Sequence, residues 1–137
     1  MKAAGLDPVA GLPAEAGVAA EFAADLHAPG RARRLVVAVL LQWGHESPLV
    51  DNAALVVSEL ATNAVLHAGS PFLVTVRADD SIVRVAVGDR SPLLATERHG
   101  GLIPRPMHGL GLVDRLSTHW GARQTHDGKV VWAELRP

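Results

Sequence analysis

Residues 58–68, with the sequence SELATNAVLHA, are the stretch on which the interpretation of this chain depends. At helical spacing, Glu59, Asn63 and His67 follow one another at intervals of four residues and fall on one face. An adjacent face carries an apolar stripe at the same spacing, formed by Val56, Leu60 and Ala64. The stretch therefore predicts a rigid helix that displays a carboxylate, an amide and an imidazole. Taken alone, such a polar stripe is more often a solvated face than a site.

Length and composition favour a single globular domain. The chain has 137 residues, of which 48% are hydrophobic and 20% charged. A net charge of −1 predicts no general attraction to nucleic acid or to an anionic membrane. The absence of cysteine excludes disulfides, zinc–thiolate sites and thiol nucleophiles. The longest apolar run, residues 35–41, is too short to span a bilayer, and polar residues and prolines near the N-terminus disfavour a signal peptide. We therefore expect a cytoplasmic protein.

The hydrophobic pattern divides the chain into a tail and one domain. Residues 1–17 lack a period and are expected to form a flexible tail, which leaves 18–137 as the domain. Helices are expected at 31–44, from a cap at Ser47-Pro48 or Asp51 to Gly69, and at 110–116. Strands are expected at 21–24, 72–78, 82–87, 120–125 and 129–135. This order predicts an α/β two-layer sandwich: a mixed, mostly antiparallel sheet of about five strands with three helices on one face.

Two further segments carry residues suited to ligand binding. Asp89 stands at a strand end, in the sequence Gly-Asp-Arg-Ser-Pro. It lies in a stretch without a hydrophobic period, residues 88–108, and loops of that length are usually functional or mobile. The sequence His-Gly-Leu-Gly-Leu at 108–112 opens a helix, where glycines let backbone N–H groups and the positive dipole end approach an anion. Each segment alone is a weak signal, because a turn or helix packing would explain it equally well.

The order and spacing of all three segments resemble the N box, the first glycine-box region and the second glycine box of the GHKL ATPase superfamily. Within it, the chain is most similar to the small stand-alone anti-sigma-factor serine kinases. The resemblance covers nearly everything after the tail, including Leu-Val-Asp at 112–114, Trp-Gly at 120–121 and Asp-Gly-Lys-Val-Val-Trp at 127–132. It implies the histidine-kinase-like, or Bergerat-type, ATP-binding fold, with ATP and Mg²⁺ as cofactors.

The resemblance also implies a role for each matching residue. Asn63 would give its side-chain oxygen to Mg²⁺, and Asp89 would accept a hydrogen bond from the adenine amino group. Glu59 would be the general base. The remaining nucleotide-binding positions would be the backbone of Gly109, Leu110 and Gly111 around the phosphates, together with Ser91, His108 and Leu112. Residues 88–108 would be the ATP lid.

Two positions depart from the family pattern. Met107 stands where the second glycine box usually begins with a further glycine. Val130 stands where a threonine commonly follows Gly-Lys and helps to hold the adenine. Either change would weaken nucleotide affinity or alter lid closure, so nucleotide binding is a safer expectation than turnover.

The function implied is that of an ATP-dependent protein serine/threonine kinase. It would transfer the γ-phosphate to a small antagonist protein and would also bind a sigma factor. The alternative is a catalytically weak or inactive nucleotide-dependent protein-binding module. The catalytic domain of a histidine kinase is disfavoured, because no helices with a phospho-acceptor histidine precede the domain. Relatives are commonly dimers, which leaves a homodimer open.

Overall fold

The computed structural model describes residues 17–91 and 107–137. Within them lie five strands and three α-helices, one of which continues into a π-helical segment. The strands are β1 (Gly17–Phe22), β2 (Phe72–Ala78), β3 (Val83–Asp89), β4 (His119–Gln124) and β5 (Lys129–Leu135). The helices are α1 (Ala28–Gln42), α2 (Leu49–Asn63), its π-helical continuation η2 (Ala64–Ala68) and α3 (Met107–Leu116).

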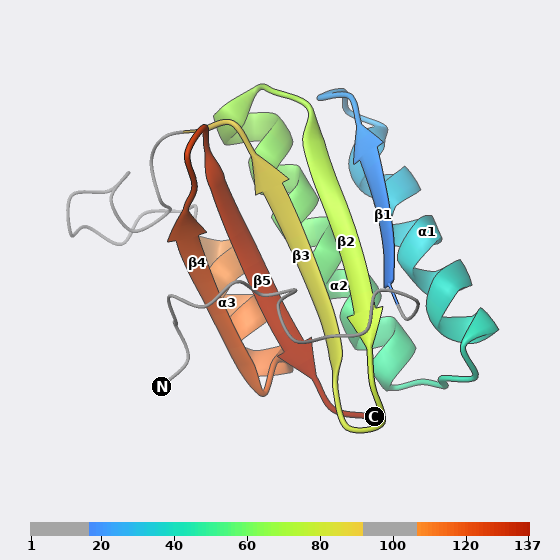
Figure 1. Cartoon of the computed structure of the whole chain (residues 1–137). Coiled ribbons are helices and arrows are strands. Elements are labelled where there is room, and N and C mark those ends of the chain that lie inside the picture. Colours follow the sequence, from blue (N-terminus) through green and yellow to red (C-terminus); the bar gives the residue numbers. More distant parts are fainter. Residues whose placement is uncertain (1–16, 92–106) are drawn as a thin grey trace.

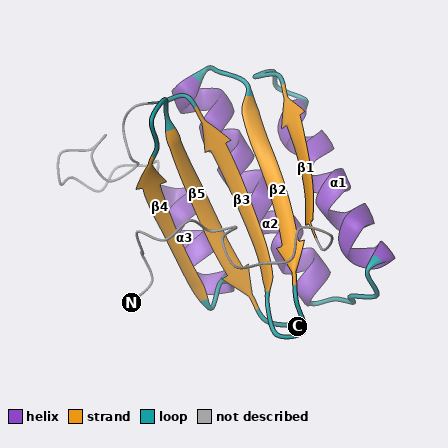
Figure 2. Ribbon diagram, viewed as in Figure 1, coloured by secondary structure: helices purple, strands orange, loops and turns teal. Residues whose placement is uncertain are grey.

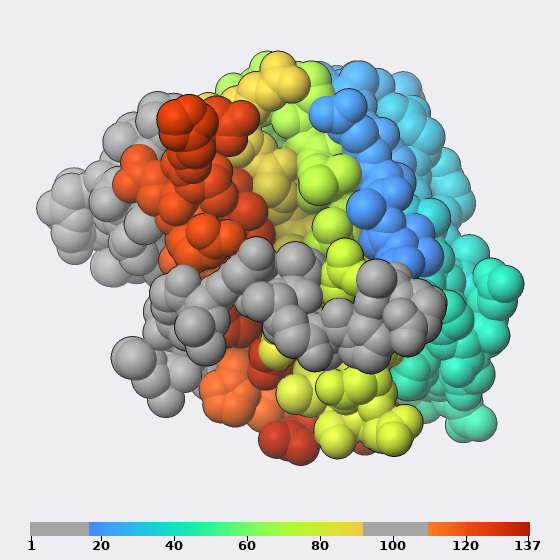
Figure 3. All heavy atoms as spheres, viewed as in Figure 1, coloured from blue at the N-terminus to red at the C-terminus, as the bar shows by residue number. Residues whose placement is uncertain are grey.

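The strands form one sheet in the order β1-β2-β3-β5-β4, and the helices cover one of its faces (Figures 1 and 2). This confirms the predicted two-layer sandwich. All four strand pairings are antiparallel, whereas the prediction allowed a mixed sheet. The space-filling view shows the other face of the sheet, with β1 along one side and β4 along the other (Figure 3).

The core lies between the sheet and the helices. Alternate residues of β2 and β3 point towards the helices, as period-two patterning requires, and are almost fully buried: Val74, Val76, Val83, Val85 and Val87. The predicted apolar stripe of α2 is also buried, with Val56, Leu60 and Ala64 exposed by 0%, 3% and 1%. Burying each large aliphatic side chain contributes roughly 1.5–3 kcal/mol, so this layer supplies much of the folding free energy.

Several helix boundaries differ from the sequence prediction. Helix α1 starts at Ala28 rather than 31, with Pro29 in its first turn, where the missing N–H is harmless. Helix α2 has Pro48 at its N-cap and no side-chain cap, so neither Ser47 nor Asp51 caps it; Asp51 lies in the first turn, where it favours the helix dipole. The predicted stop is confirmed, because Gly69 follows η2 with φ 61°.

Strand β1 shows the largest boundary error. It runs from Gly17 to Phe22, whereas the sequence suggested 21–24 and placed Gly17 in the tail. The rest of that tail, 1–16, lies outside the described residues. The strand pairs along its whole length with β2, so its position is set by hydrogen bonds to a neighbour rather than by its own composition.

The combined helix α2–η2 deserves comparison with a membrane span. Residues Leu49–Ala68 are long and apolar enough to cross a bilayer by length and composition, and half of the span is buried inside the protein. Its buried residues belong to the core that also contains the sheet. The core helix of a globular domain has the same properties.

Two hydrogen bonds to the Asp79 side chain stabilise the turn between β2 and β3. Asp79 Oδ1 accepts the backbone N–H of Ser81 at 2.7 Å and that of Ile82 at 2.9 Å. These backbone hydrogen bonds, that from Ser81 above all, hold the pKa of the Asp79 carboxyl below its ordinary value. The carboxylate therefore stabilises the turn above the pKa of an unfolded aspartate, and this stabilisation is lost as the pH falls through the lower folded pKa.

We predict that Asp79→Ala lowers the thermal unfolding midpoint at pH 7 by a few degrees. The difference from the parent should narrow below about pH 4, where the parent carboxylate becomes protonated. Thermal melts followed by circular dichroism across this pH range measure it. Asp80→Ala, at the exposed neighbouring position, is the matched control. An equal loss in both variants would show that the Asp79 hydrogen bonds do not stabilise the turn.

Candidate functional site

Glu59 and Asn63 lie one turn apart at the C-terminal end of α2. Both are half-buried, and the residues between and beside them, Leu60 and Ala61, are buried in the core. Within the described ranges 17–91 and 107–137, neither polar side chain takes part in a hydrogen bond or an ion pair. A packed helix therefore presents a carboxylate and an amide whose bonding capacity remains available to a ligand.

The helix changes type immediately after Asn63. Residues Ala64–Ala68 form a π-helical segment, closed by the bond from the Gly69 N–H to the Ala64 carbonyl at 3.1 Å. A π-helical turn contains more residues than an α-helical one, so side chains beyond Asn63 rotate away from the α-helical register. Glu59 and Asn63 lie in α2 as predicted, whereas His67 belongs to the π-helical segment, whose register differs from that of the predicted α-helix. Such π-helical insertions are frequent at functional sites.

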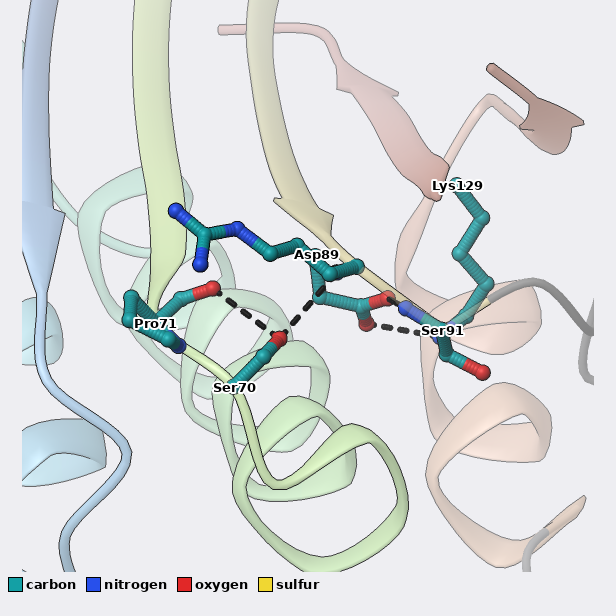
Figure 4. A network of polar contacts seen from close by, with 6 residues as sticks. Ser70, Pro71, Asp89, Ser91 and Lys129 are labelled. Atoms are coloured by element: carbon teal, nitrogen blue, oxygen red, sulfur yellow. Dashed lines mark hydrogen bonds and ion pairs between the residues drawn. The ribbon is translucent and has the colours of Figure 1, made fainter. Parts of the chain in front are cut away.

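The end of β3 meets the end of this helix. The Arg90 N–H donates to the Ser70 hydroxyl at 3.1 Å, and that hydroxyl donates to the Pro71 carbonyl at 3.1 Å (Figure 4). Because Ser70 directly follows the helix stop at Gly69, these bonds tie the exit of α2–η2 to the residue after Asp89. The end of α2–η2, the start of β2 and the end of β3 lie at the same end of the sheet (Figure 1).

Asp89 is the most constrained polar residue of the site. Its side chain is 4% exposed, and both carboxylate oxygens are engaged. Oδ1 accepts the Ser91 N–H at 2.8 Å, and Oδ2 lies 2.6 Å from the Lys129 ammonium, whose side chain is 6% exposed (Figure 4). The carboxylate thus has a fixed orientation and a cation that compensates for its burial. Ser91, also a predicted site residue, contributes its backbone to this arrangement.

Lys129 was missed by sequence reasoning, which examined Val130 instead. Asp89 and Lys129 stand directly opposite each other in the β3–β5 register, so their side chains share a face of the sheet. Val130 stands opposite Gly88, on the other face, and therefore does not lie beside Asp89. The sequence does contain a signal for its burial, because side chains alternate between the two faces of a strand. Lys129 is in phase with the buried residues Val131, Ala133 and Leu135.

Gly128 makes the approach of the two strands possible. A Cβ atom at this position would lie 2.7 Å from Arg90 Cα and 2.8 Å from the Asp89 carbonyl carbon, closer than real contacts allow. Only glycine leaves room for the end of β3 beside the β4–β5 turn. The turn residue predicted for the hairpin is thus also part of the wall next to Asp89.

The second predicted glycine segment lies in the first turns of a helix, as expected, although the helix begins at Met107 rather than at 110. Helix α3 begins at Met107, so the N–H groups of residues 107–109, in its first turn, have no partner within the helix. Of the three predicted backbone donors, Gly109 keeps its N–H available, whereas the N–H groups of Leu110 and Gly111 fall in the hydrogen-bond pattern of the helix. The Leu110 side chain is 2% exposed and anchors α3 in the core, and Leu112 is half-buried. The side chains of Met107 and His108, and the predicted lid at 92–106, lie outside the described residues.

A pocket of about 620 Å³ lies at the opposite end of α2. Asn52, in the first turns of the helix, lines it together with residues 44–49, 116–118 and 135–137. Asn52 and Asn63 are eleven positions apart, which corresponds to roughly 16 Å along an α-helix. None of the predicted site residues contributes to this pocket, so it is separate from the site at Asp89.

The polar groups at the end of the sheet that carries Asp89 fit a nucleotide bound with magnesium. Across the residues that the structure describes, no three histidine or acidic side chains gather in a group that could hold a metal. An amide oxygen such as that of Asn63 fits Mg²⁺, which keeps several waters and binds substrate phosphates rather than a protein cage. The first-turn N–H groups of α3 suit phosphate oxygens, and the Asp89 carboxylate suits an amino group.

Comparison with known proteins agrees with this fold. A family model described as the histidine kinase-like ATPase domain matches residues 22–135. Among solved structures, the crystal structure of the RsbU and RsbW domains of Rv1364c from Mycobacterium tuberculosis is similar in fold, with a TM-score of 0.70 and 18% sequence identity over 88% of this chain. The match spans 32% of that longer chain. No curated protein matches the sequence significantly.

We predict that Gly128→Ala destabilises the protein by about 1–3 kcal/mol, the usual range for overpacking, because β3 must move away from the β4–β5 turn. Gly111→Ala is the control: nothing lies within 4 Å of its added Cβ, and alanine in a helix is favoured over glycine by roughly 0.5–1 kcal/mol. Chemical denaturation of both variants measures the effect. A Gly128→Ala variant as stable as the parent would contradict the close approach.

Proposed function

Because the chain belongs to the histidine kinase-like ATPase domain family, we propose that it is an ATP-dependent regulator that phosphorylates a serine or threonine of a small antagonist protein and also binds a sigma factor. ATP binding is what the family implies. The choice of substrate and the regulatory partners rest on the sequence resemblance to anti-sigma-factor kinases. The observation that carries the catalytic part is the placement of Glu59 and Asn63 at the C-terminal end of one packed helix, whose exit is hydrogen-bonded to the residue after Asp89.

The proposed transfer divides the work among residues of this chain. Glu59 takes the proton of the substrate hydroxyl as the hydroxyl oxygen forms a bond to the γ-phosphorus. The bond between that phosphorus and the β-phosphate oxygen breaks, and ADP leaves. Phosphoryl transfer requires mainly positioning and neutralisation of charge, so one carboxylate base can suffice. Mg²⁺, when held by Asn63, supplies part of that neutralisation.

The remaining roles are binding roles. Asp89 selects adenine by accepting a hydrogen bond from its amino group, and the first-turn N–H groups of α3 bind phosphate. The π-helical segment determines where the helix ends after Asn63, and Ser70 then contacts the end of β3. The proposed general base, Glu59, lies on α2, and the carboxylate proposed to recognise adenine, Asp89, lies on β3. Their contributions can therefore be separated by mutation.

We predict that Asn63→Ala removes Mg²⁺-dependent nucleotide binding. Glu59, one turn away, is assigned to the proton, and the described residues offer no cluster that could replace the amide as a metal ligand. Calorimetric titration with ATP in the presence of Mg²⁺ or of a chelator measures the loss. Asn52→Ala, on the same helix but at its other end, should bind as the parent does. Parent-like affinity in Asn63→Ala would show that Asn63 is not the metal ligand.

We predict that Glu59→Gln leaves ATP affinity within about threefold of the parent and slows phosphoryl transfer by roughly 10²–10⁴. Glutamine keeps the shape of the side chain but cannot accept the proton at neutral pH. Single-turnover transfer from γ-labelled ATP to a cognate antagonist measures the rate, and Glu46→Gln, at the other end of α2, serves as the control. Transfer at the parent rate would refute the base assignment. No transfer by the parent would favour the alternative of a nucleotide-dependent binding module.

A further inference from the structure

Lys129 is a buried cation at the point where the proposed function places the nucleotide base. Its ammonium lies 2.6 Å from Asp89 Oδ2, and the two side chains are 6% and 4% exposed. Sequence reasoning assigned it no role. A lysine is seldom buried unless it is paired, so its presence here requires a physical explanation.

Counting donors and acceptors shows that the pair is not saturated. An ionised carboxylate offers about four acceptor positions, and Asp89 uses one for the Ser91 N–H and one for Lys129. An ammonium group has three N–H donors, and within residues 17–91 and 107–137 the Lys129 side chain has Asp89 as its hydrogen-bond partner. The site therefore presents an acceptor and a donor next to each other, each with remaining capacity.

The backbone holds this donor beside the acceptor. Asp89 and Lys129 are partners in the β3–β5 register, and the approach of the strands at this point depends on Gly128. The Ser91 N–H fixes the carboxylate from the other side at 2.8 Å. An acceptor and a donor that are fixed relative to each other can recognise a ligand edge with neighbouring donor and acceptor groups.

The edge of adenine has this arrangement, since its 6-amino group donates and the adjacent ring nitrogen N1 accepts. We propose that Lys129 is a second base-recognition residue, which donates to N1 while Asp89 accepts from the amino group. The inference rests on the proposed function, because it assumes that the adenine of ATP binds at Asp89. It assigns the lysine a contact with the ligand in addition to its compensation of the buried carboxylate.

The test uses a nucleotide that lacks the acceptor. In 1-deaza-ATP a C–H group replaces N1, so it keeps the amino group for Asp89 but cannot accept from Lys129. Titration of the full chain with Mg-ATP and Mg-1-deaza-ATP should give at least about tenfold weaker binding of the analogue, the range expected for one hydrogen bond to a charged group. In Lys129→Met the two nucleotides should bind within about threefold of each other.

Two controls keep the result interpretable. Arg123→Met removes a positive charge on the other face of the sheet, where Arg123 stands opposite Val130, and should retain the parent ratio of affinities. Lys129→Leu provides a second substitution that cannot donate to N1 should Lys129→Met fail to fold, as shown by its circular dichroism melt. Equal affinity of the parent for both nucleotides overturns the proposal without any variant.

The outcomes distinguish this inference from the proposed function. A parent that binds Mg-ATP, with the same ratio of affinities as Lys129→Met, overturns the role of Lys129 and leaves nucleotide binding intact. Tighter ATP binding by Lys129→Met with an unchanged ratio would show that the lysine only competes for Asp89, which also overturns it. A parent that binds neither nucleotide overturns both proposals.

Discussion

Burial of one face of α2 against the sheet is the interaction on which the rest of the structure depends. The helix contributes eight buried residues, from Leu49 to Ala61, and it contacts α1, α3 and the central strands. Because this face is fixed by packing, the adjacent positions Glu59 and Asn63 are fixed as well. The π-helical segment then ends the helix beside β3, where the bond between Ser70 and Arg90 joins the two elements. The site is thus a consequence of how the core helix packs and ends.

Stability alone does not explain the buried pair of Asp89 and Lys129. Removing two charges from water is unfavourable, and replacing a buried ion pair by apolar residues is often neutral or stabilising. Breaking such a pair by removing one partner is costly, so each residue constrains the other. Recognition of a ligand at the strand end where we propose that the nucleotide binds explains the pair better than stability does. Gly128 fits this explanation, because it gives up a side chain to let the two strands approach.

The sequence predicted the fold where periodicity was strong. Strands β2 and β5 match their predicted ranges. Valines alternate with polar residues in β2, and the Asp127-Gly128 turn marks the start of β5. Strand β1 was misplaced, since its small residues, Gly17 and Ala19 among them, carry little pattern and depend on pairing with β2. The order of the site segments along the chain was sufficient to recognise the family. The π-helical segment after Asn63 and the pairing of Lys129 with Asp89 were not predicted, because a π-helical turn and a cross-strand partner 40 residues away depend on tertiary structure.

The most direct test of the account is a map of where Mg-ATP binds, obtained from backbone amide shifts of the isotope-labelled chain in NMR titration. If Mg-ATP binds at Asp89, the largest changes fall at the C-terminal end of α2, at residues 88–91, at Lys129 and in the first turn of α3. Little change is then expected around the separate pocket formed by residues 44–49, 116–118 and 135–137. Changes concentrated at that pocket, or no changes at saturating Mg-ATP, would show that the nucleotide does not bind at Asp89.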